Sequence, residues 1–256
     1  MSFFEVIILG IVEGITEFLP ISSTGHLILT AKLLGFSQDN FTKSFEIAIQ
    51  LGAILSVVVL YAKSLIRDLE LFKKVLVACL PTMIVGLVFY KLIKKFLFNS
   101  LEVVLISLLL GGIFLIVFEV FYSRKKAARA TGEISYQQAF FIGVFQSLAV
   151  IPGISRAGAV IIGGLILGIT RQKIVEFSFL LAVPTMLAAT GFDLMNSGHE
   201  FNHDQWLYLL AGCAVSFLTA MASIKFLLIF IKNNNFIPFG IYRIFLAVIF
   251  FLFIAR

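Results

Sequence analysis

The chain has 256 residues, of which 60% are hydrophobic and only 13% are charged, about half the charged share of an ordinary soluble domain. A mean hydropathy of +1.06 and 29 Phe residues exclude a soluble globular protein, because only lipid can cover so much apolar surface. The net charge of +6 would suit nucleic acid, but in a membrane protein it is typical of cytoplasmic loops and of contact with anionic lipids. We therefore expect membrane lipids, and no nucleic acid, as partners.

Six stretches are predicted to span the membrane as helices: 45–62, 75–90, 101–122, 176–195, 206–231 and 237–255. Two further regions, about 1–36 and 137–170, are apolar but interrupted by Gly, Pro, Ser, Glu and Arg. Their pieces are too short to span, so we predict two broken or re-entrant helical hairpins, which are tolerated at depth only under protein or water. The first residues lack a basic segment and a cleavage site, and we expect no removable signal peptide.

The two interrupted regions resemble each other at a single offset of 133 residues. Gly10 matches Gly143, Gly35 matches Gly168, and the run Ser22 to Gly25 matches Ser155 to Gly158. Three matches in one register indicate an internal duplication. We predict one membrane domain over residues 1–256: a first repeat of about 1–122, a basic linker 123–135 and a second repeat of about 136–256.

Loop charge predicts the orientation. Residues 123–132 contain two Arg and two Lys, so we place this loop inside. Residues 196–205 contain two acidic residues and no Lys or Arg, so we place this loop outside. Counting spans places 63–74 inside, which agrees, but it places Lys91, Lys94 and Lys95 outside, which disagrees. On this count the two hairpins enter from opposite sides, as in an inverted-topology repeat whose tips meet near the midplane.

The first chemical motif runs from Glu13 to His26 and reads EGITEFLPISSTGH. Glu13 and Glu17 are four residues apart, so on a helix they share one face, about 5–6 Å apart at Cβ. Two such carboxylates repel unless one is protonated or a cation lies between them. Pro20 ends the helix, and the hydroxyl-rich turn of Ser22, Ser23 and Thr24 then offers donors at a helix N-terminus, a natural anion site.

The second motif reads PGISRAG from Pro152 to Gly158. Gly153 and Gly158 allow a ligand to approach the backbone closely. Arg156 is the only strong base between Arg129 and Arg171, and its guanidinium can bind phosphate oxygens through two parallel hydrogen bonds.

Buried charge is expensive in a bilayer. Each ionised group at the centre costs about 2.5–3.5 kcal/mol. Glu13, Glu17 and Arg156 together therefore approach the ~5–15 kcal/mol that stabilises a whole domain. This cost favours a functional site, and the alternative is a purely structural ion pair that locks the two hairpins.

The two motifs resemble the signatures of the undecaprenyl-diphosphate phosphatase family, the bacitracin-resistance family of bacteria. The resemblance extends to FEIAIQLG from Phe45, EFSFLLAVP from Glu176 and FIPFGIYR from Phe236 to Arg243, and so covers nearly the whole chain. It implies hydrolysis of undecaprenyl diphosphate to the monophosphate, recycling of the carrier lipid for peptidoglycan synthesis, a divalent metal, and an outward-facing site in the inner membrane. One departure is Ala157, where many members have Ser, which argues against an essential hydroxyl there.

The residues also suit diphosphate hydrolysis on physical grounds, because phosphoryl transfer needs positioning and charge compensation. Arg156 and Ser155 would clamp the diphosphate, with Ser22, Thr24, Gly153 and Gly158 at the substrate. Glu13 and Glu17 would hold Mg²⁺ or Ca²⁺. His26 could move protons. The nucleophile is either Ser23, activated by His26, or a water activated by a glutamate; the sequence does not separate these.

Two rival functions remain. A lipid flippase or secondary transporter would also use broken helices at the midplane. An intramembrane serine protease would use a Ser–His pair, but it needs neither an acidic pair nor a buried arginine, and the Gly-x-Ser-x-Gly elbow is missing. The sequence does not determine the oligomeric state, and a homodimer is one alternative.

Overall fold

The computed structural model describes residues 1–35, 40–92, 100–124, 133–197 and 201–254, and every regular element in these ranges is helical. The predicted all-α class is therefore confirmed. Lys94, Lys95, most of the basic linker, part of the 196–205 loop and the last residue of the sixth predicted stretch lie outside the described residues.

Among the described residues, five helices are long and apolar enough to cross a membrane: Phe41–Ser64, Leu69–Phe89, Leu101–Tyr122, Arg171–Gly191 and His203–Phe230. They belong to α3 (Asn40–Arg67), α4 (Leu69–Leu92), α5 (Leu101–Arg124), α8 (Arg171–Ser197) and α9 (His203–Phe230). The sixth predicted stretch is α10 (Ile237–Ile254), an apolar helix below the length of the other five.

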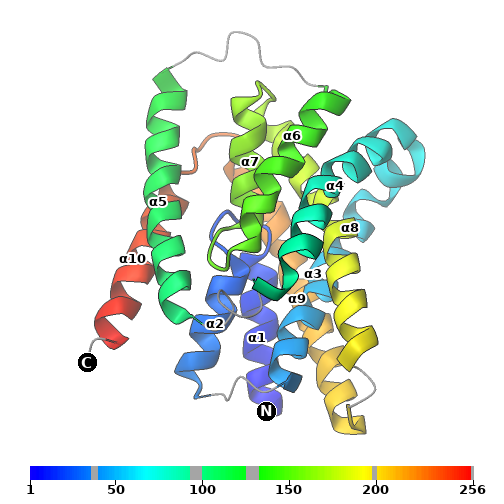
Figure 1. Ribbon diagram of the computed structural model, residues 1–256, viewed down its shortest axis with the longest axis vertical. Coiled ribbons are helices and arrows are strands. Elements are labelled where there is room, and N and C mark those ends of the chain that lie inside the picture. The colour runs from blue at the N-terminus through cyan, green and yellow to red at the C-terminus, as the bar shows by residue number, and fades with distance from the viewer. Residues whose placement is uncertain (36–39, 93–99, 125–132, 198–200, 255–256) are drawn as a thin grey trace.

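Each interrupted region forms two short helices joined by an irregular turn, as predicted. The first holds α1 (Phe3–Thr16) and α2 (Ser23–Leu33). The second holds α6 (Tyr136–Ser147), a short 3-10 turn η2 (Leu148–Val150) and α7 (Arg156–Ile166). In Figure 1 the two hairpins enter from opposite ends of the molecule, and their turns meet about half-way along it.

Local signals explain where these helices begin and end. Ser2 and Ser135 each form a capping box at the start of their hairpin, and Ser22 and Ser155 each accept a backbone N–H at the start of the second helix. Beyond the second helices, Gly35 and Gly168 adopt φ of 74° and 81°, the left-handed geometry that ends a helix. The Gly35/Gly168 pair and the Ser22/Ser155 pair belong to two of the three matches that the sequence analysis found.

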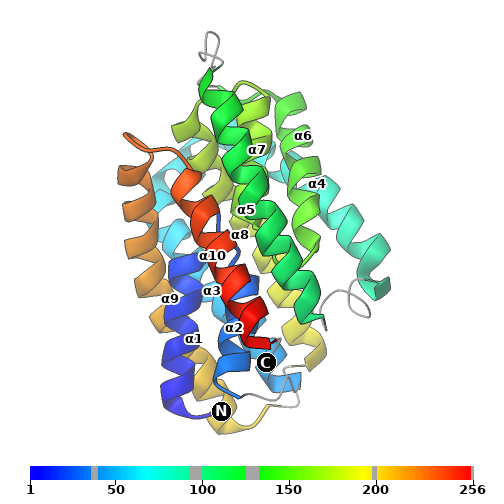
Figure 2. The same cartoon turned by 90° about the vertical axis from the view of Figure 1, so that its left-hand side faces the viewer.

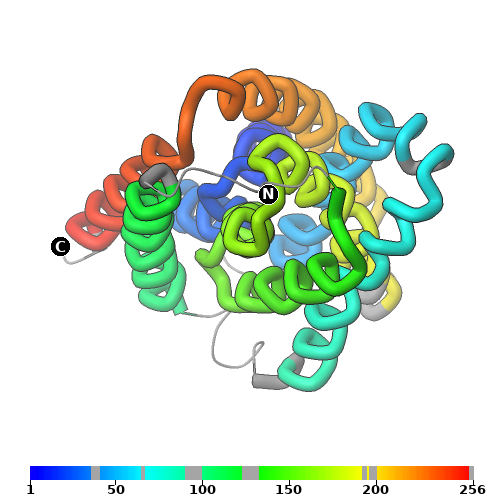
Figure 3. Tube along the Cα trace, turned by 90° about the horizontal axis from the view of Figure 1, so that it is seen from above, coloured from blue at the N-terminus to red at the C-terminus, as the bar shows by residue number. Residues whose placement is uncertain are grey.

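The longer helices enclose the hairpins. Helix α1 packs against α9, and α6 packs against α4, while α5 pairs with α10 and α3 packs against both α8 and α9. Figure 2 shows α5 beside α10, and Figure 3, a view along the long axis, shows α7 near the centre of the ring of helices.

Gly10 and Gly143 permit close contacts between the hairpins and the helices that enclose them. A Cβ on Gly143 would lie 2.1 Å from the carbonyl oxygen of Ala78 in α4, and one on Gly10 would lie 2.9 Å from that of Gly212 in α9. Any side chain here would push the hairpins away from the helices that enclose them.

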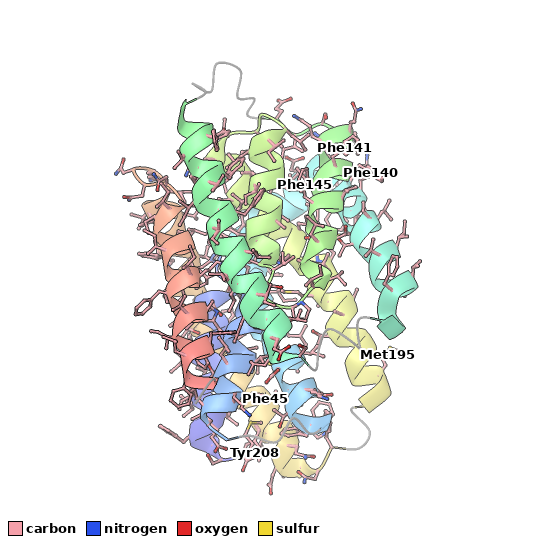
Figure 4. The ribbon with its side chains drawn as sticks, turned by 60° about the vertical axis from the view of Figure 1, so that its left-hand side comes forward. Phe45, Phe140, Phe141, Phe145, Met195 and Tyr208 are labelled. Atoms are coloured by element: carbon pink, nitrogen blue, oxygen red, sulfur yellow. The ribbon has the colours of Figure 1, made fainter. Side chains whose placement is uncertain are left out.

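The outside of the molecule is apolar. Phe140 and Phe141 of α6 are 43% and 45% exposed and point outward in Figure 4, whereas Phe45 is buried inside. Leu87 on α4 and Phe253 on α10 are exposed by 74% and 69%. Apolar side chains on so many outer helix faces require lipid around the protein.

Candidate active site

The turns of the two hairpins border one cavity of about 180 Å³ at the middle of the molecule. The first hairpin contributes Glu17, Ser22, Ser23 and Thr24, and the second contributes Ser155 and Arg156. The acid of one half and the base of the other therefore share a pocket, as the sequence analysis predicted. The cavity is smaller than the roughly 300–1,000 Å³ typical of ligand pockets, which matches a head group rather than a whole lipid.

Glu17 is the centre of the polar network. Its Oε1 accepts a hydrogen bond from Arg156 Nη2 at 2.8 Å, and its Oε2 accepts one from the hydroxyl of Ser23. The second guanidinium nitrogen, Nη1, donates to the carbonyl of Ser178 in α8 at 2.7 Å. The Glu17 side chain is 2% exposed and that of Arg156 12%, so the pair is largely shielded from solvent. This contact is also the ion pair that the structural alternative required.

The N-termini of α2 and α7 both lie at this cavity. Ser22 caps α2 by accepting the N–H of Gly25 at 3.3 Å, and Ser155 caps α7 by accepting the N–H of Gly158 at 3.0 Å. The partial positive charge of both helix ends favours an anion in the cavity, which a simple ion-pair lock would not need.

The backbone of both turns is unusual at one residue each. Ser22 has a φ of 73° and is the only non-glycine residue with positive φ among those described. Gly153 has a φ of 90° and lies so close to α5 that a Cβ would be 2.7 Å from the carbonyl oxygen of Val104. Such geometry is concentrated at binding sites, where the surroundings hold the chain in place.

Glu13 lies fully buried one helical turn before Glu17, and its two carboxylate oxygens have no hydrogen-bond donor among the described residues. A carboxylate in this state is an oxygen donor available to a cation. Mg²⁺ commonly uses one or two carboxylates together with water and phosphate oxygens. The described residues contain no group of three His, Cys, Asp or Glu that could hold a metal, and Glu13 is not among the residues that line the cavity.

His26 lies apart from the position expected for an activator of Ser23. Its Nδ1 is 2.7 Å from the carbonyl oxygen of Ser22, and its Nε2 is 2.8 Å from the hydroxyl of Tyr242 in α10. Both ring nitrogens therefore have partners other than Ser23, whose hydroxyl binds Glu17. The expected His26–Ser23 pair is not formed.

Arg243 in α10 was not among the predicted site residues, yet it connects the two turns. Its Nη2 donates to the carbonyls of Gly153 and Ser107 at 3.0 Å each, and its Nη1 donates to that of Pro20 at 3.4 Å. The arginine is 3% exposed. The sequence signal that could have identified Arg243 as a site residue is the presence of a charge inside the last apolar helix.

Other polar residues of the helices complete the wall. Gln50 and Gln146 line the cavity, and Gln146 Nε2 donates to the hydroxyl of Thr82 at 2.9 Å. Thr82 and Thr185 were missed, although each directly follows the proline inside its helix, Pro81 or Pro184.

Residues 6–249 match the family described as bacitracin resistance protein BacA. The chain belongs to this family. Its similarity to curated members is high throughout: it is 52% identical to the undecaprenyl-diphosphatase of Aquifex aeolicus, over 98% of both chains. It is also 52% identical to that of Persephonella marina, over 99% of this chain and all of the other, and 49% identical to that of Wolinella succinogenes, over 98% and 97%.

The family assignment agrees with the resemblance that the two motifs carried. In this BacA family member, both motifs meet at the one cavity: Glu17 and Ser23 come from the first and Arg156 from the second. The transporter and protease alternatives receive no support from these comparisons.

Proposed function

We propose that this protein hydrolyses undecaprenyl diphosphate to undecaprenyl monophosphate and phosphate. The reaction recycles the lipid carrier for peptidoglycan synthesis and contributes to bacitracin resistance. The observation that carries the proposal is that Glu17, Ser23 and Arg156 share one cavity, which lies at the N-termini of two helices. The names of the close relatives point to the same substrate.

We propose that the chain lies in the bacterial inner membrane as an inverted-topology repeat with six spans and two re-entrant hairpins. The basic linker would face the cytoplasm, and the cavity would open outward. The matched caps of the two hairpins support the repeat. The apolar outer face supports lipid on all sides, with the prenyl chain outside the small cavity.

Binding of the diphosphate would use groups that already converge on the cavity. The N-termini of α2 and α7 supply backbone N–H groups, and Ser22, Thr24 and Ser155 supply hydroxyls. Arg156 would offer its guanidinium to the phosphate oxygens and share it with Glu17. Gly153 and Gly158 do not line the cavity; they would act indirectly, because Gly153 lets its turn pack against α5 and Gly158 donates its N–H to the Ser155 cap. The spread negative charge of phosphoryl transfer is compensated in this way.

The geometry favours Ser23 as the nucleophile, with Glu17 in place of His26 as its proton acceptor. The Ser23 oxygen would attack the terminal phosphorus while its proton passes to Glu17, and the anhydride P–O bond breaks to release the lipid monophosphate. Water would then hydrolyse the phosphoserine. Direct attack by a water that Glu17 activates is the alternative, and it leaves Ser23 as a donor only.

We propose that Glu13 and Glu17 hold Mg²⁺ or Ca²⁺ when the metal is bound. The ion would neutralise charge on the phosphate oxygens. The unpartnered oxygens of Glu13 support this assignment. His26 does not line the cavity, and it would instead hold the Ser22 turn in place through its contacts with Ser22 and Tyr242.

Phosphate release tests the function. Purified protein in detergent, given undecaprenyl diphosphate and Mg²⁺, is expected to release phosphate with no membrane gradient. Glu17→Gln should lower the rate at least a hundredfold, because the proton acceptor and the partner of Arg156 are both lost. Lipid binding without phosphate release by the wild type would reject hydrolysis.

A further inference from the structure

A second cavity lies away from the hydrolysis site, at the end of the molecule where α3 ends and α4 begins, at the upper right of Figure 1. Its volume is about 350 Å³, compared with about 180 Å³ at the hydrolysis site. None of the residues that line it contributes to the first cavity.

Three basic side chains line this second cavity. Lys63 and Arg67 are one turn apart on α3, and Lys173 lies in the first turn of α8. Among the described residues, the ion pairs outside the hydrolysis site are Lys73 with Glu70 and Arg171 with Glu119. The three cations of the cavity take part in neither, so their charge is available to a ligand.

The two acids on the cavity wall are held by other groups. Asp68 accepts the backbone N–H of Leu71 at 2.8 Å and so caps the start of α4. Glu176 accepts a hydrogen bond from Gln172, one turn earlier on α8, at 3.0 Å. Three bases against two acids leave an excess of positive charge, and the hydroxyls of Tyr61 and Ser64 add donors.

The cavity lies where three candidate spans begin or end, which is the level expected for lipid head groups. Ser64 ends one candidate span, Leu69 begins the next, and Arg171 begins a third. Leu71 and Phe177 form an apolar part of the wall, and nearby Leu69 and Phe72 are 66% and 40% exposed. A basic pocket at the ends of spans, beside an apolar surface, suits a phosphate group attached to acyl chains.

We propose that this cavity binds the phosphate group of an anionic phospholipid, at a site separate from the one that hydrolyses the diphosphate. Inorganic phosphate carries the same chemistry but no acyl chains, so the test must include both. This inference goes beyond the proposed function and does not depend on it. The two cavities share no lining residue, so a variant that loses lipid binding in the second cavity keeps its hydrolysis site intact.

Native mass spectrometry of the full chain in detergent tests the proposal. Dioleoyl-phosphatidylglycerol is the probe, with dioleoyl-phosphatidylcholine and inorganic phosphate as separate arms. We expect the double variant Arg67→Gln/Lys173→Gln to bind phosphatidylglycerol more weakly, about fivefold for each basic side chain lost and about 25-fold for the pair. Phosphate release from undecaprenyl diphosphate should stay at the wild-type level.

The matched control is Lys32→Gln/Lys43→Gln, which removes the same charge from two exposed lysines that do not line the cavity. It should bind the lipid as the wild type does, and so should the charge-preserving variant Arg67→Lys/Lys173→Arg. Equal binding by wild type and Arg67→Gln/Lys173→Gln would overturn the proposal. Binding of inorganic phosphate alone, or of phosphatidylcholine as tightly as phosphatidylglycerol, would overturn the assignment to an anionic lipid.

Discussion

Glu17 holds together groups that are far apart in the sequence. The same carboxylate accepts the hydroxyl of Ser23, six residues on, and the guanidinium of Arg156, 139 residues on. Each charge would be costly alone at this depth, and each partner lowers the cost of the other. The network leaves Ser23 oriented by an acid and bordering the cavity, as a nucleophile or donor requires.

Ser23→Ala separates these two roles. If Ser23 is the nucleophile, phosphate release should fall at least a thousandfold, because the attacking oxygen is lost. Protein yield and thermal unfolding in detergent should stay close to wild type. The control is Ser147→Ala, since that exposed hydroxyl only bonds to its own helix. Retention of a tenth of the activity or more would assign the attack to water.

The types of residue that form the site could be predicted from the sequence, but the hydrogen-bond partners of each side chain could not. The types and spacing of Glu17, Ser23 and Arg156 pointed to one phosphate site. His26 was expected to contact Ser23 because the two are close in the motif. It binds Tyr242 instead, 216 residues away, and no local pattern reveals which of several nearby polar groups a side chain will meet.

At the scale of the elements, the two irregular turns depend on Arg243. A turn at membrane depth leaves carbonyl groups without helical donors, and each unsatisfied group costs several kcal/mol in lipid. The guanidinium of Arg243 bonds to Pro20 in one turn and to Gly153 in the other, and to Ser107 in α5. It therefore holds the two turns next to each other without lining the cavity itself.

Arg243→Gln should loosen both turns. We expect a loss of about 3 kcal/mol or more in the free energy of unfolding, from several carbonyls left unpaired. Phosphate release should fall at least tenfold in the protein that remains folded, and Arg243→Lys should restore part of both. Lys225→Gln, on the exposed face of α9, is the control. Wild-type stability and turnover in Arg243→Gln would remove the positioning role.

Helix boundaries show where sequence patterns reach their limit. The interrupted regions and most spans were predicted, because Gly, Pro and Ser interrupt the hairpins and apolar runs mark the spans. The start of α4 was placed at 75, but the helix begins at Leu69. Glu70, Lys73 and Lys74 made its first turns look like a loop, whereas Asp68 caps them as helix and the ion pair of Glu70 with Lys73 lies on an exposed face.

At the scale of the whole molecule, the two halves supply opposite charges to one cavity. The first hairpin carries Glu13 and Glu17, and the second carries Arg156, although α2 and α7 have the same length and the same kind of serine cap. A similar backbone in both halves places two helix N-termini together, and the divergence of side chains makes the site. Apolar outer helices then leave the lipid tail in the membrane.

A metal requirement should appear as loss of activity on chelation. Phosphate release should stop in excess EDTA and return when Mg²⁺ or Ca²⁺ is added beyond the chelator. In Glu13→Gln, the Mg²⁺ concentration for half-maximal rate should rise on the order of tenfold, because one of two carboxylate ligands is lost. Full activity in EDTA would exclude the divalent ion, and an unchanged Mg²⁺ dependence in Glu13→Gln would exclude Glu13 as its ligand.

The rate of phosphate release from undecaprenyl diphosphate by Arg156→Lys tests the central claim most directly. The guanidinium binds Glu17 and Ser178 through two separate nitrogens, and a single ammonium cannot keep both contacts and also bind phosphate. The account predicts a folded protein whose kcat/KM is at least a hundredfold below wild type, nearly as low as that of Arg156→Ala. A lysine variant with wild-type kcat/KM would contradict it.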